Sequence, residues 1–392
     1  MTAVTYEERR LPPSEEQQYG SRRLNLLRRT PYRAAVPAMI ADASFDLSAD
    51  VLAAADDATQ SLVRFDSDAA RFPAPLSAVL LRSESASSSQ IENLTSAPRA
   101  IAEAAIGENL EGNGPLIVSN VRAMEAAIAL SDELSNHSLI RMHDALLSDS
   151  DPGIVGDYRR EQVWIGGSLP HSARFVPPHH DRVRESMDDL IRFTQRTDLP
   201  VLVQAAIAHA QFETVHPFPD GNGRVGRALL HAMLRHGGVL RNVAVPVSAG
   251  LLSEVDSYFE ALTRYREGDP GRIIDVFASA SVAALVNADT LAKDLAELEL
   301  RWEVLLSGIR SDAVARRLAT ATIGQPVLNL ASATALTGAS KAAVGNGLAQ
   351  LVERGVLAAG NSKKRNRIWI NADVLDALTA FAERSGRRQS GV

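Results

Sequence analysis

Cysteine is absent from this 392-residue sequence, and aromatic side chains make up only 5% of it. Without cysteine the chain can form no disulfide, no zinc finger with thiolate ligands and no thiol nucleophile. Few aromatics and many alanines favour helices over a β-sandwich. The net charge of −6 argues against a whole-chain nucleic-acid binder, although it leaves room for a local basic patch.

An apolar leader is also missing. Charged residues occupy positions 7–10, where a secretory signal would need apolar ones. We expect no segment to span a bilayer and therefore no membrane partner. Hydrophobic residues at 45% and charged residues at 22% are ordinary for a globular protein, and the length suits two or three domains. We expect a cytoplasmic protein whose polar residues 1–33 form an extended arm.

The most informative stretch runs from His216 to Arg227 and reads HPFPDGNGRVGR. Residues 201–215 before it are apolar and rich in alanine, which predicts a buried helix. Residues 225–235 predict a second helix, which ends at the glycines 237–238. The stretch is therefore predicted to be a glycine-rich loop that leads into a new helix N-terminus.

Four residues of this loop suit a phosphate ligand. Gly221 and Gly223 can adopt backbone angles that let successive N–H groups converge on an anion, and the helix N-terminus adds its positive end. Arg224 and Arg227 lie three residues apart, so both guanidinium groups can grip phosphate oxygens. No Gly-Lys-[Ser/Thr] follows the glycines, so the loop is not a P-loop.

Two further residues complete the chemistry. Asp220 is an unusual neighbour for an anion unless a divalent cation such as Mg²⁺ lies between them. His216 titrates near neutrality and is a candidate general base. Each residue alone could be structural, since a Gly-Asn-Gly turn is often only a turn. Their combination within twelve positions is what indicates a site.

The stretch resembles the signature of Fic-domain proteins, His-Pro-Phe-x-Asp-Gly-Asn-Gly-Arg-x-x-Arg, and matches every specified position. The resemblance implies a mainly helical Fic fold and nucleotidyl transfer, most often of AMP from ATP onto a protein hydroxyl. It implies His216 as the base and Asp220 as the Mg²⁺ ligand. The nucleotide-binding residues would be Phe218, Pro219, Asp220, Gly221, Asn222, Gly223, Arg224 and Arg227.

A second motif lies upstream, in a predicted helix over 76–93 whose many serines give it weak helix propensity. Ser88-x-x-x-Glu92-Asn93 resembles the inhibitory [Ser/Thr]-x-x-x-Glu-[Gly/Asn] motif of Fic proteins. The resemblance implies that Glu92 pairs with Arg227 and takes the place of the ATP γ-phosphate. The alternative is an exposed polar helix end with Asn93 as its C-cap.

Residues 154–178 contain β-type runs over 158–167 and 173–178, which predict a β-hairpin. In the Fic resemblance this hairpin is the flap, whose edge aligns a target segment by strand addition. The residues that would contact the target are Val163, Trp164, Ile165 and Gly166. The alternative is a loop that only covers the core.

The tail predicts a helix–turn–helix over 328–354 and a β-wing around a basic turn at 361–365, which resembles a winged helix. DNA phosphates could be contacted by basic residues, namely Lys341, Lys363, Lys364, Arg365 and Arg367. The second helix offers mostly Ala and Gly to read bases, which favours docking or oligomerisation instead. A leucine-rich repeat at helical spacing, from intramolecular packing or from a homodimer seam, is formed by Leu291, Leu295, Leu298, Trp302 and Leu305.

The predicted fold is all-α, with a β-hairpin flap and a C-terminal winged helix. Its expected parts are an N-terminal helical region (1–110), a Fic core (111–270), linking helices (271–320) and the winged helix (321–392). The predicted function is a protein adenylyltransferase acting on a Tyr, Thr or Ser of a target protein or of itself, and autoinhibited by Glu92. Alternatives are AMP removal by the same residues, a nucleotide-sensing DNA-binding regulator, and transfer of UMP or phosphocholine.

Overall fold

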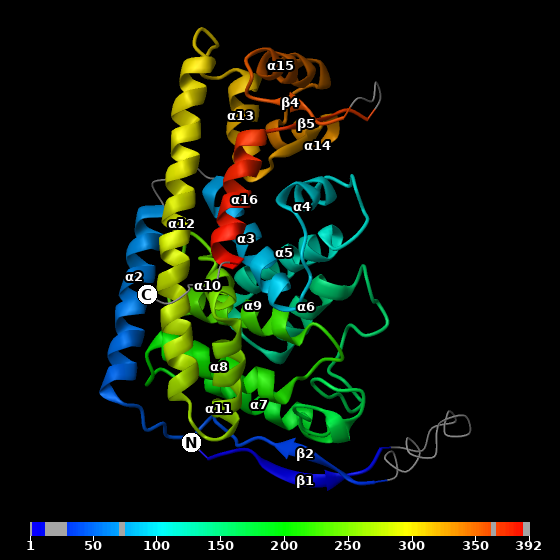
Figure 1. Cartoon of the computed structure of the whole chain (residues 1–392), viewed down its shortest axis with the longest axis vertical. Coiled ribbons are helices and arrows are strands. Elements are labelled where there is room, and N and C mark those ends of the chain that lie inside the picture. Colours follow the sequence, from blue (N-terminus) through cyan, green and yellow to red (C-terminus); the bar gives the residue numbers. More distant parts are fainter. Residues whose placement is uncertain (1, 12–29, 70–74, 362–365, 387–392) are drawn as a thin grey trace, which may run out of the picture. The chain divides into compact units, whose positions relative to one another are not determined.

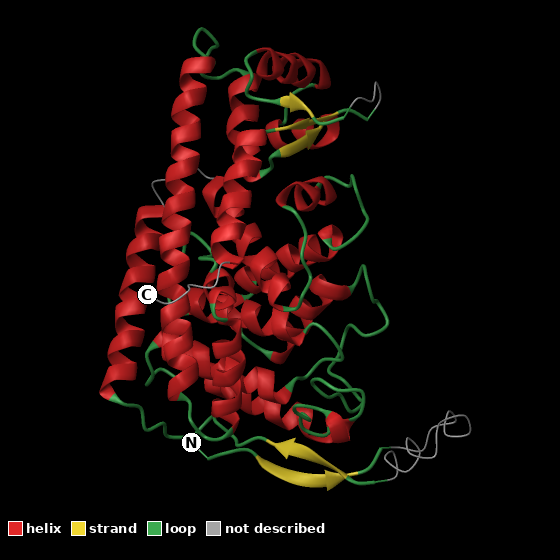
Figure 2. Ribbon diagram, viewed as in Figure 1, coloured by secondary structure: helices red, strands yellow, loops and turns green. Residues whose placement is uncertain are grey.

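The computed structural model describes residues 2–11, 30–69, 75–361 and 366–386 (Figures 1 and 2). It is 63% helix and 6% strand, which confirms the predicted mainly helical fold. Two compact units can be distinguished. Unit 1 is formed by Met1–Asp57, Glu125–Gly237 and Asp256–Ala278, and unit 2 by Ala58–Met124, Gly238–Val255 and Ser279–Val392.

Five helices build most of unit 1: α6 (Asn136–Leu147), α7 (Val183–Thr194), α8 (Val201–Val215), α9 (Asn222–His236) and α11 (Val255–Arg266). Helix α8 lies at the centre, since every residue from Leu202 to Val215 is buried. Its many alanines allow α7 and α9 to pack closely against it. The helix predicted over 201–215 is confirmed, and so is the helix that follows the loop.

The N-terminal part of unit 1 forms an antiparallel pair of strands, β1 (Thr5–Arg9) and β2 (Tyr32–Val36). The prediction of an extended arm over 1–33 is wrong for these residues. Burial explains the pairing, because β2 is apolar and carries three buried residues. An ion pair connects β1 to the short 3₁₀ helix η4 (His180–Arg182), where Arg182 Nη2 lies 2.8 Å from Glu7 Oε2.

Unit 2 contains α3 (Pro75–Ile91), α4 (Pro98–Ala105) and α10 (Val247–Ser253). The serine-rich α3 is stabilised by partners rather than by its own propensity. Asn120 Nδ2 donates to Ser85 O at 2.8 Å and to Ser89 Oγ at 3.1 Å. The buried carboxylate of Glu84 accepts hydrogen bonds from the backbone N–H and the hydroxyl of Ser248.

The C-terminal part of unit 2 consists of α13 (Val314–Gly324), β3 (Val327–Asn329), α14 (Leu330–Thr337), α15 (Lys341–Glu353), β4 (Ala358–Ala359), β5 (Ile368–Ile370) and α16 (Ala372–Gly386). The strands form a sheet in the order β3-β5-β4. Gly338 makes the turn between α14 and α15 with φ 64°, as the helix–turn–helix prediction requires. The winged helix itself stays a prediction. Residues Lys363, Lys364 and Arg365 lie outside the described residues.

Helices α2 (Ala49–Ala69), α5 (Gly114–Ala129) and α12 (Gly271–Leu305) contribute residues to both units. Within the described residues, α12 is the helix that is long and apolar enough to cross a membrane by length and composition, although we expected none. In its most apolar window 44% of the residues are buried, and core helices of soluble proteins share this composition. Four residues of the predicted leucine repeat are buried, and Leu305 is exposed. The buried residues are Leu291, Leu295, Leu298 and Trp302.

Candidate active site

The joint between α8 and α9 is shaped by two left-handed residues. His216 caps α8 with φ 50° and ψ 62°, a conformation that non-glycine residues seldom adopt. Its backbone N–H still donates to Phe212 O at 2.8 Å, so His216 closes the helix and then leaves it. Gly221 precedes α9 with φ 77°. The chain therefore reverses between His216 and Gly221, which confirms the predicted loop.

The side chain of Asn222 holds this loop closed. Its Oδ1 accepts from the backbone N–H of Phe218 at 2.8 Å, and its Nδ2 donates to Phe218 O at 2.8 Å. The side chain thus pairs with one residue's backbone on both sides, as a neighbouring strand would. We predicted Asn222 as a phosphate ligand, whereas the structure shows its amide bonded to the loop.

Phe218 anchors the loop in the interior. Its side chain is fully buried and stacks on the imidazole of His143, with ring centroids 3.9 Å apart and planes 2° from parallel. His143 Nε2 lies 3.1 Å from Asp220 O, so one α6 residue contacts the loop twice. Burial lowers the pKa of His143, so the ring is neutral. Sequence reasoning missed His143, because nothing in an amphipathic helix distinguishes it.

Glycine is required at position 221 for two reasons. The positive φ disfavours a side chain, and a Cβ there would lie 2.8 Å from Leu146 Cδ2. Since no side chain caps α9 at this residue, the first backbone N–H groups of the helix are left to other partners. A helix N-terminus of this kind binds anions.

The charged residues of the loop differ in exposure. Arg224 and Arg227 are buried, with relative exposures of 5% and 2%. The side chain of Asp220 is 69% exposed, and its Oδ2 lies 3.5 Å from Arg224 Nη2. Within the described residues no group of three or more His, Asp or Glu side chains could hold a metal ion. A single exposed carboxylate beside an anion-binding loop nevertheless suits Mg²⁺, which often takes one or two carboxylates and further oxygens from a phosphate substrate.

His216 faces a carboxylate and two cations. Its Nδ1 lies 3.7 Å from Glu213 Oε2, and its side chain is 21% exposed. Burial, followed by the positive charges of Arg159 and Arg266, lowers the pKa of His216 to about 3. The imidazole is therefore neutral at pH 7 and can accept a proton.

Arg159 supports the loop by hydrogen bonds to its backbone. Sequence reasoning missed this residue. It is 4% exposed, and its guanidinium donates to His216 O at 2.8 Å and to Val215 O at 3.3 Å. It also donates to Glu161 O at 2.8 Å and to Pro178 O at 2.6 Å. The bonds to His216 O and Val215 O satisfy carbonyl groups that α8 leaves open at its C-terminal end. Burial lowers the pKa of Arg159 to about 10, so the side chain stays charged at pH 7.

The arrangement agrees with comparisons to known proteins. Residues 133–234 match the model of the Fic/DOC family. The chain carries a Fic/DOC-family domain.

Relatives of this Fic domain include protein adenylyltransferase fic-1 of Caenorhabditis elegans, 34% identical over 110 residues, which are 27% of this chain and 20% of that protein. Protein adenylyltransferase Fic of Drosophila willistoni is 27% identical over 149 residues, 38% of this chain and 28% of that protein. The matches thus span less than a third of either relative. A Fic family protein from Desulfovibrio desulfuricans G20 shares the fold at 20% identity, with a TM-score of 0.53 over 83% of this chain and 97% of that one.

The segment predicted to be the flap, residues 154–178, is less regular than the predicted hairpin. Val163, Trp164, Ile165 and Gly166 form no regular strand, and the pairing is one isolated antiparallel bridge between Ile165 and Phe175. A longer ladder is prevented by the positive φ of Gly166 and Gly167 and by the prolines at 170, 177 and 178. Trp164 instead packs with Tyr32, Ala34 and Val176. Contact of the flap with a target stays a prediction.

The second predicted motif lies at the end of α3 in unit 2. Ser88 is buried within the helix, whereas Glu92 and Asn93 lie just beyond its end and are exposed. Asn93 has φ 62°, and both Glu92 N and Leu94 N donate to Ser89 O at 3.0 Å. Asn93 is thus the helix C-cap that we considered as an alternative. Because Glu92 and Arg227 belong to different units, their pairing stays a prediction.

Proposed function

We propose that this protein is a protein adenylyltransferase, which moves AMP from ATP to a Tyr, Thr or Ser hydroxyl of a target protein or of itself. The observation that carries the proposal is the loop from His216 to Arg227, which combines an uncapped helix N-terminus, a neutral histidine and buried arginines. The names of the curated relatives of the Fic domain support the same reaction.

In this proposal the loop binds the phosphates of ATP. The N–H groups at the start of α9 and the guanidinium groups of Arg224 and Arg227 hold the phosphate oxygens. Asn222 acts indirectly by holding the backbone of Phe218 in place. Because these donors are fixed before the nucleotide arrives, little reorganisation opposes the reaction.

His216 acts as the general base. The carboxylate of Glu213 near Nδ1 favours the tautomer with its proton on that atom, which leaves Nε2 to accept one. Negative charge from bound phosphates raises the pKa of the imidazole from its low value and makes it a better base. His216 takes the proton of the target hydroxyl, the hydroxyl oxygen bonds to the α-phosphorus, and the bond to the β-phosphate breaks to release pyrophosphate.

Asp220 would hold Mg²⁺ on the phosphate chain. The ion, when bound, neutralises phosphate charge and orients the leaving pyrophosphate. The exposed carboxylate of Asp220 is the residue of the loop that suits this role. Arg224, only 3.5 Å from it, orients the carboxylate.

Glu92 would restrain the enzyme. The support is its exposed place on the tight turn after α3, in a sequence that resembles the inhibitory motif of Fic proteins. A carboxylate paired with Arg227 would compete with the γ-phosphate for the same guanidinium group. Replacing Glu92 with glycine removes the competitor and leaves the loop intact.

Intact-mass spectrometry after incubation with ATP and Mg²⁺ tests this function. We expect an added AMP mass on Glu92→Gly, and neither on wild type nor on Glu111→Gly, a matched change at an exposed glutamate of the same unit. Combining His216→Ala with Glu92→Gly, or adding EDTA to the Glu92→Gly reaction, should abolish the added AMP mass. Lysate proteins and labelled ATP extend the assay to other targets. If Glu92→Gly binds ATP but modifies neither itself nor lysate proteins, the proposal is wrong.

We also propose that residues 314–386 form a winged helix. The order of α13, β3, α14, α15, β4 and β5 and the sheet order β3-β5-β4 support it. Of the basic residues named above, Lys341 and Arg367 are exposed. Salt-dependent binding to DNA fragments is the measurement that separates a DNA-binding role from a docking role.

A further inference from the structure

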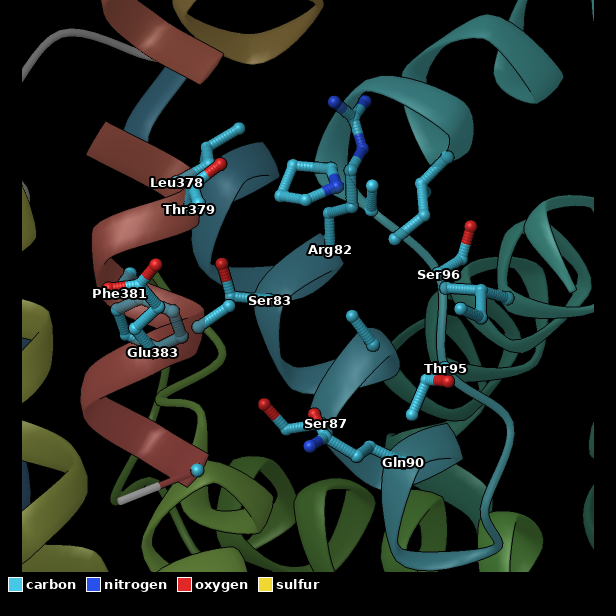
Figure 3. Close-up of a pocket in the computed structure, with 17 residues that line it drawn as sticks. Arg82, Ser83, Ser87, Gln90, Thr95, Ser96, Leu378, Thr379, Phe381 and Glu383 are labelled. Carbon is cyan, nitrogen blue, oxygen red and sulfur yellow. The ribbon is translucent and has the colours of Figure 1, made fainter. Parts of the chain in front are cut away.

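A cavity of about 880 Å³ lies within unit 2, beside α3 (Figure 3). Its walls come from α3, from the loop and first turn of α4 at residues 95–101, from Ile117 of α5, and from α16 between Leu378 and Gly386. A volume of this size suits a small-molecule ligand. The predicted catalytic loop contributes nothing to it, so the cavity is separate from the site described above.

The face of α3 that lines the cavity is polar, although it is largely closed to solvent. Ser83 and Ser87 have exposures of only 8% and 5%. Within the described part of the chain neither hydroxyl has a hydrogen-bond partner, and the same is true of the Gln90 amide. These groups line the cavity, so they are free to donate to and accept from a ligand bound there. Figure 3 shows these three side chains along α3, together with Thr95, which also lines the cavity.

The lining also indicates the kind of ligand. Its charged residues are Arg82 and Glu383, whose charges sum to zero, so no net charge selects an ion. Hydroxyl and amide groups both donate and accept hydrogen bonds. The remaining walls are apolar, including Ile101, Ile117 and Phe381. These features suit an uncharged molecule that has several hydroxyl or amide groups and one apolar face.

The cavity is directly connected to the turn that carries Glu92. Gln90 and Thr95 both line the cavity, and Glu92 lies between them in the sequence. The intervening turn is tight, because Glu92 N and Leu94 N donate to the same carbonyl oxygen of Ser89. A ligand that displaced Gln90 or Thr95 would therefore displace the turn as a whole.

We propose that this cavity is a regulatory site for an uncharged, hydroxyl- or amide-bearing ligand, and that its occupant moves Glu92 and releases the restraint on adenylyl transfer. The inference rests on the proposed function, since it requires Glu92 to be inhibitory. Release is the expected direction because a carboxylate–guanidinium pair depends on close geometry, which displacement of the turn disrupts.

The absence of cysteine allows a direct test. Ser87→Cys places a unique thiol in the cavity, and 2-hydroxyethyl methanethiosulfonate then attaches a small neutral group with a hydroxyl. Val304→Cys, at a residue of α12 that is 74% exposed, is the matched control. Ser83→Cys provides a second lining position if Ser87→Cys does not fold. Circular dichroism of each labelled protein verifies folding.

We expect labelled Ser87→Cys to incorporate AMP about tenfold faster than the unlabelled variant, a change within the usual range of coupling between two sites. Labelled Val304→Cys should match its unlabelled form. If Glu92→Gly is active and the label on Ser87→Cys has no effect, the regulatory inference is wrong while the proposed function stands. If Glu92→Gly is itself inactive, the proposed function and the regulatory inference both fail.

Labelling rates test the ligand class independently of activity. A neutral reagent should react with Ser87→Cys faster than the anionic 2-sulfonatoethyl methanethiosulfonate does, with both rates normalised to Val304→Cys. Faster reaction of the anionic reagent would show an anion site and overturn the class proposed here. Failure of both reagents to react would show that the cavity admits no ligand.

Discussion

Replacement of Arg159 by methionine tests how the catalytic loop is held. The buried guanidinium donates four hydrogen bonds to carbonyl oxygens, of His216, Val215, Glu161 and Pro178. Methionine fills part of the same volume without any donor. The substitution therefore leaves carbonyl groups unsatisfied at the end of α8, where the His216 backbone turns out of the helix.

The expected loss of stability in Arg159→Met follows from these hydrogen bonds. Hydrogen bonds that involve a charged group contribute about 1.5–3 kcal/mol each, and relief of the desolvated charge offsets part of the loss. Each buried carbonyl group left without a donor costs about 1–3 kcal/mol, so we expect a net loss of about 3–5 kcal/mol. This loss corresponds to a decrease in Tm on the order of 10 °C. Displacement of the His216 imidazole should lower the rate of AMP transfer about 100-fold.

The neighbouring arginine provides the control. The Arg160 side chain is 85% exposed, and its only described ion pair is with Asp157 at 2.8 Å. Exposed pairs of this kind contribute little, so Arg160→Met should change stability by less than about 0.5 kcal/mol. Thermal unfolding followed by circular dichroism gives Tm, and mass spectrometry in the Glu92→Gly background gives the rate. An Arg159→Met protein that matches Arg160→Met in both measurements would refute this account of the loop.

Two further substitutions test the loop and the core. Gly221→Ala should destabilise the protein by about 2–4 kcal/mol, because of the positive φ and the contact of the new Cβ with Leu146. The control Gly338→Ala also has a positive φ but open space around it, so it should cost only about 1–2 kcal/mol. Equal losses in urea unfolding would contradict the predicted clash with Leu146. Burial lowers the pKa of His209 to about 3, below its ordinary 6.5, so its contribution to stability is present above pH 6.5 and is lost as the pH falls toward 3. Between pH 7 and 5.5 we expect wild type to lose about 1 kcal/mol that His209→Gln does not lose, with exposed His137→Gln behaving as wild type. The same pH dependence in His209→Gln and wild type would disprove this assignment.

Local sequence information was sufficient for the helices around the loop. The apolar run over 201–215 has one interpretation because no polar face interrupts it, and the glycines at 221 and 237 mark where the next helix begins and ends. The helix–turn–helix over 330–353 was predictable for the same reason, since Gly338 separates two regular patterns.

Contacts between distant segments were not predictable. The strands at 5–9 and 32–36 are far apart in sequence, and the charges of the first resemble a solvated arm until its partner is known. The sequence did not single out Arg159 either, because an arginine that becomes buried cannot be distinguished from an exposed one within a polar stretch. Its role depends on carbonyl groups more than fifty residues away.

The flap shows a third kind of error. Residue types over 158–178 favour strands, and one bridge does form at Ile165 and Phe175. Turn geometry then overrides the preference, since two consecutive glycines with positive φ and three prolines leave few backbone groups able to continue the ladder. Composition predicted where the two segments pair but not how short the pairing is.

The bonded side chain of Asn222 also bears on how the protein ages. Asn followed by Gly is the dipeptide most prone to spontaneous deamidation, because the next backbone nitrogen can attack the side-chain carbonyl. Here that carbonyl accepts from Phe218 N and the amide nitrogen donates to Phe218 O, within the first turn of a helix, so neither group can rotate toward Gly223. Deamidation at this site therefore requires the loop to open first, and the resulting aspartate lacks the donor needed to close it again. Chemical damage accumulated at Asn222 is thus a record of how often the loop has opened.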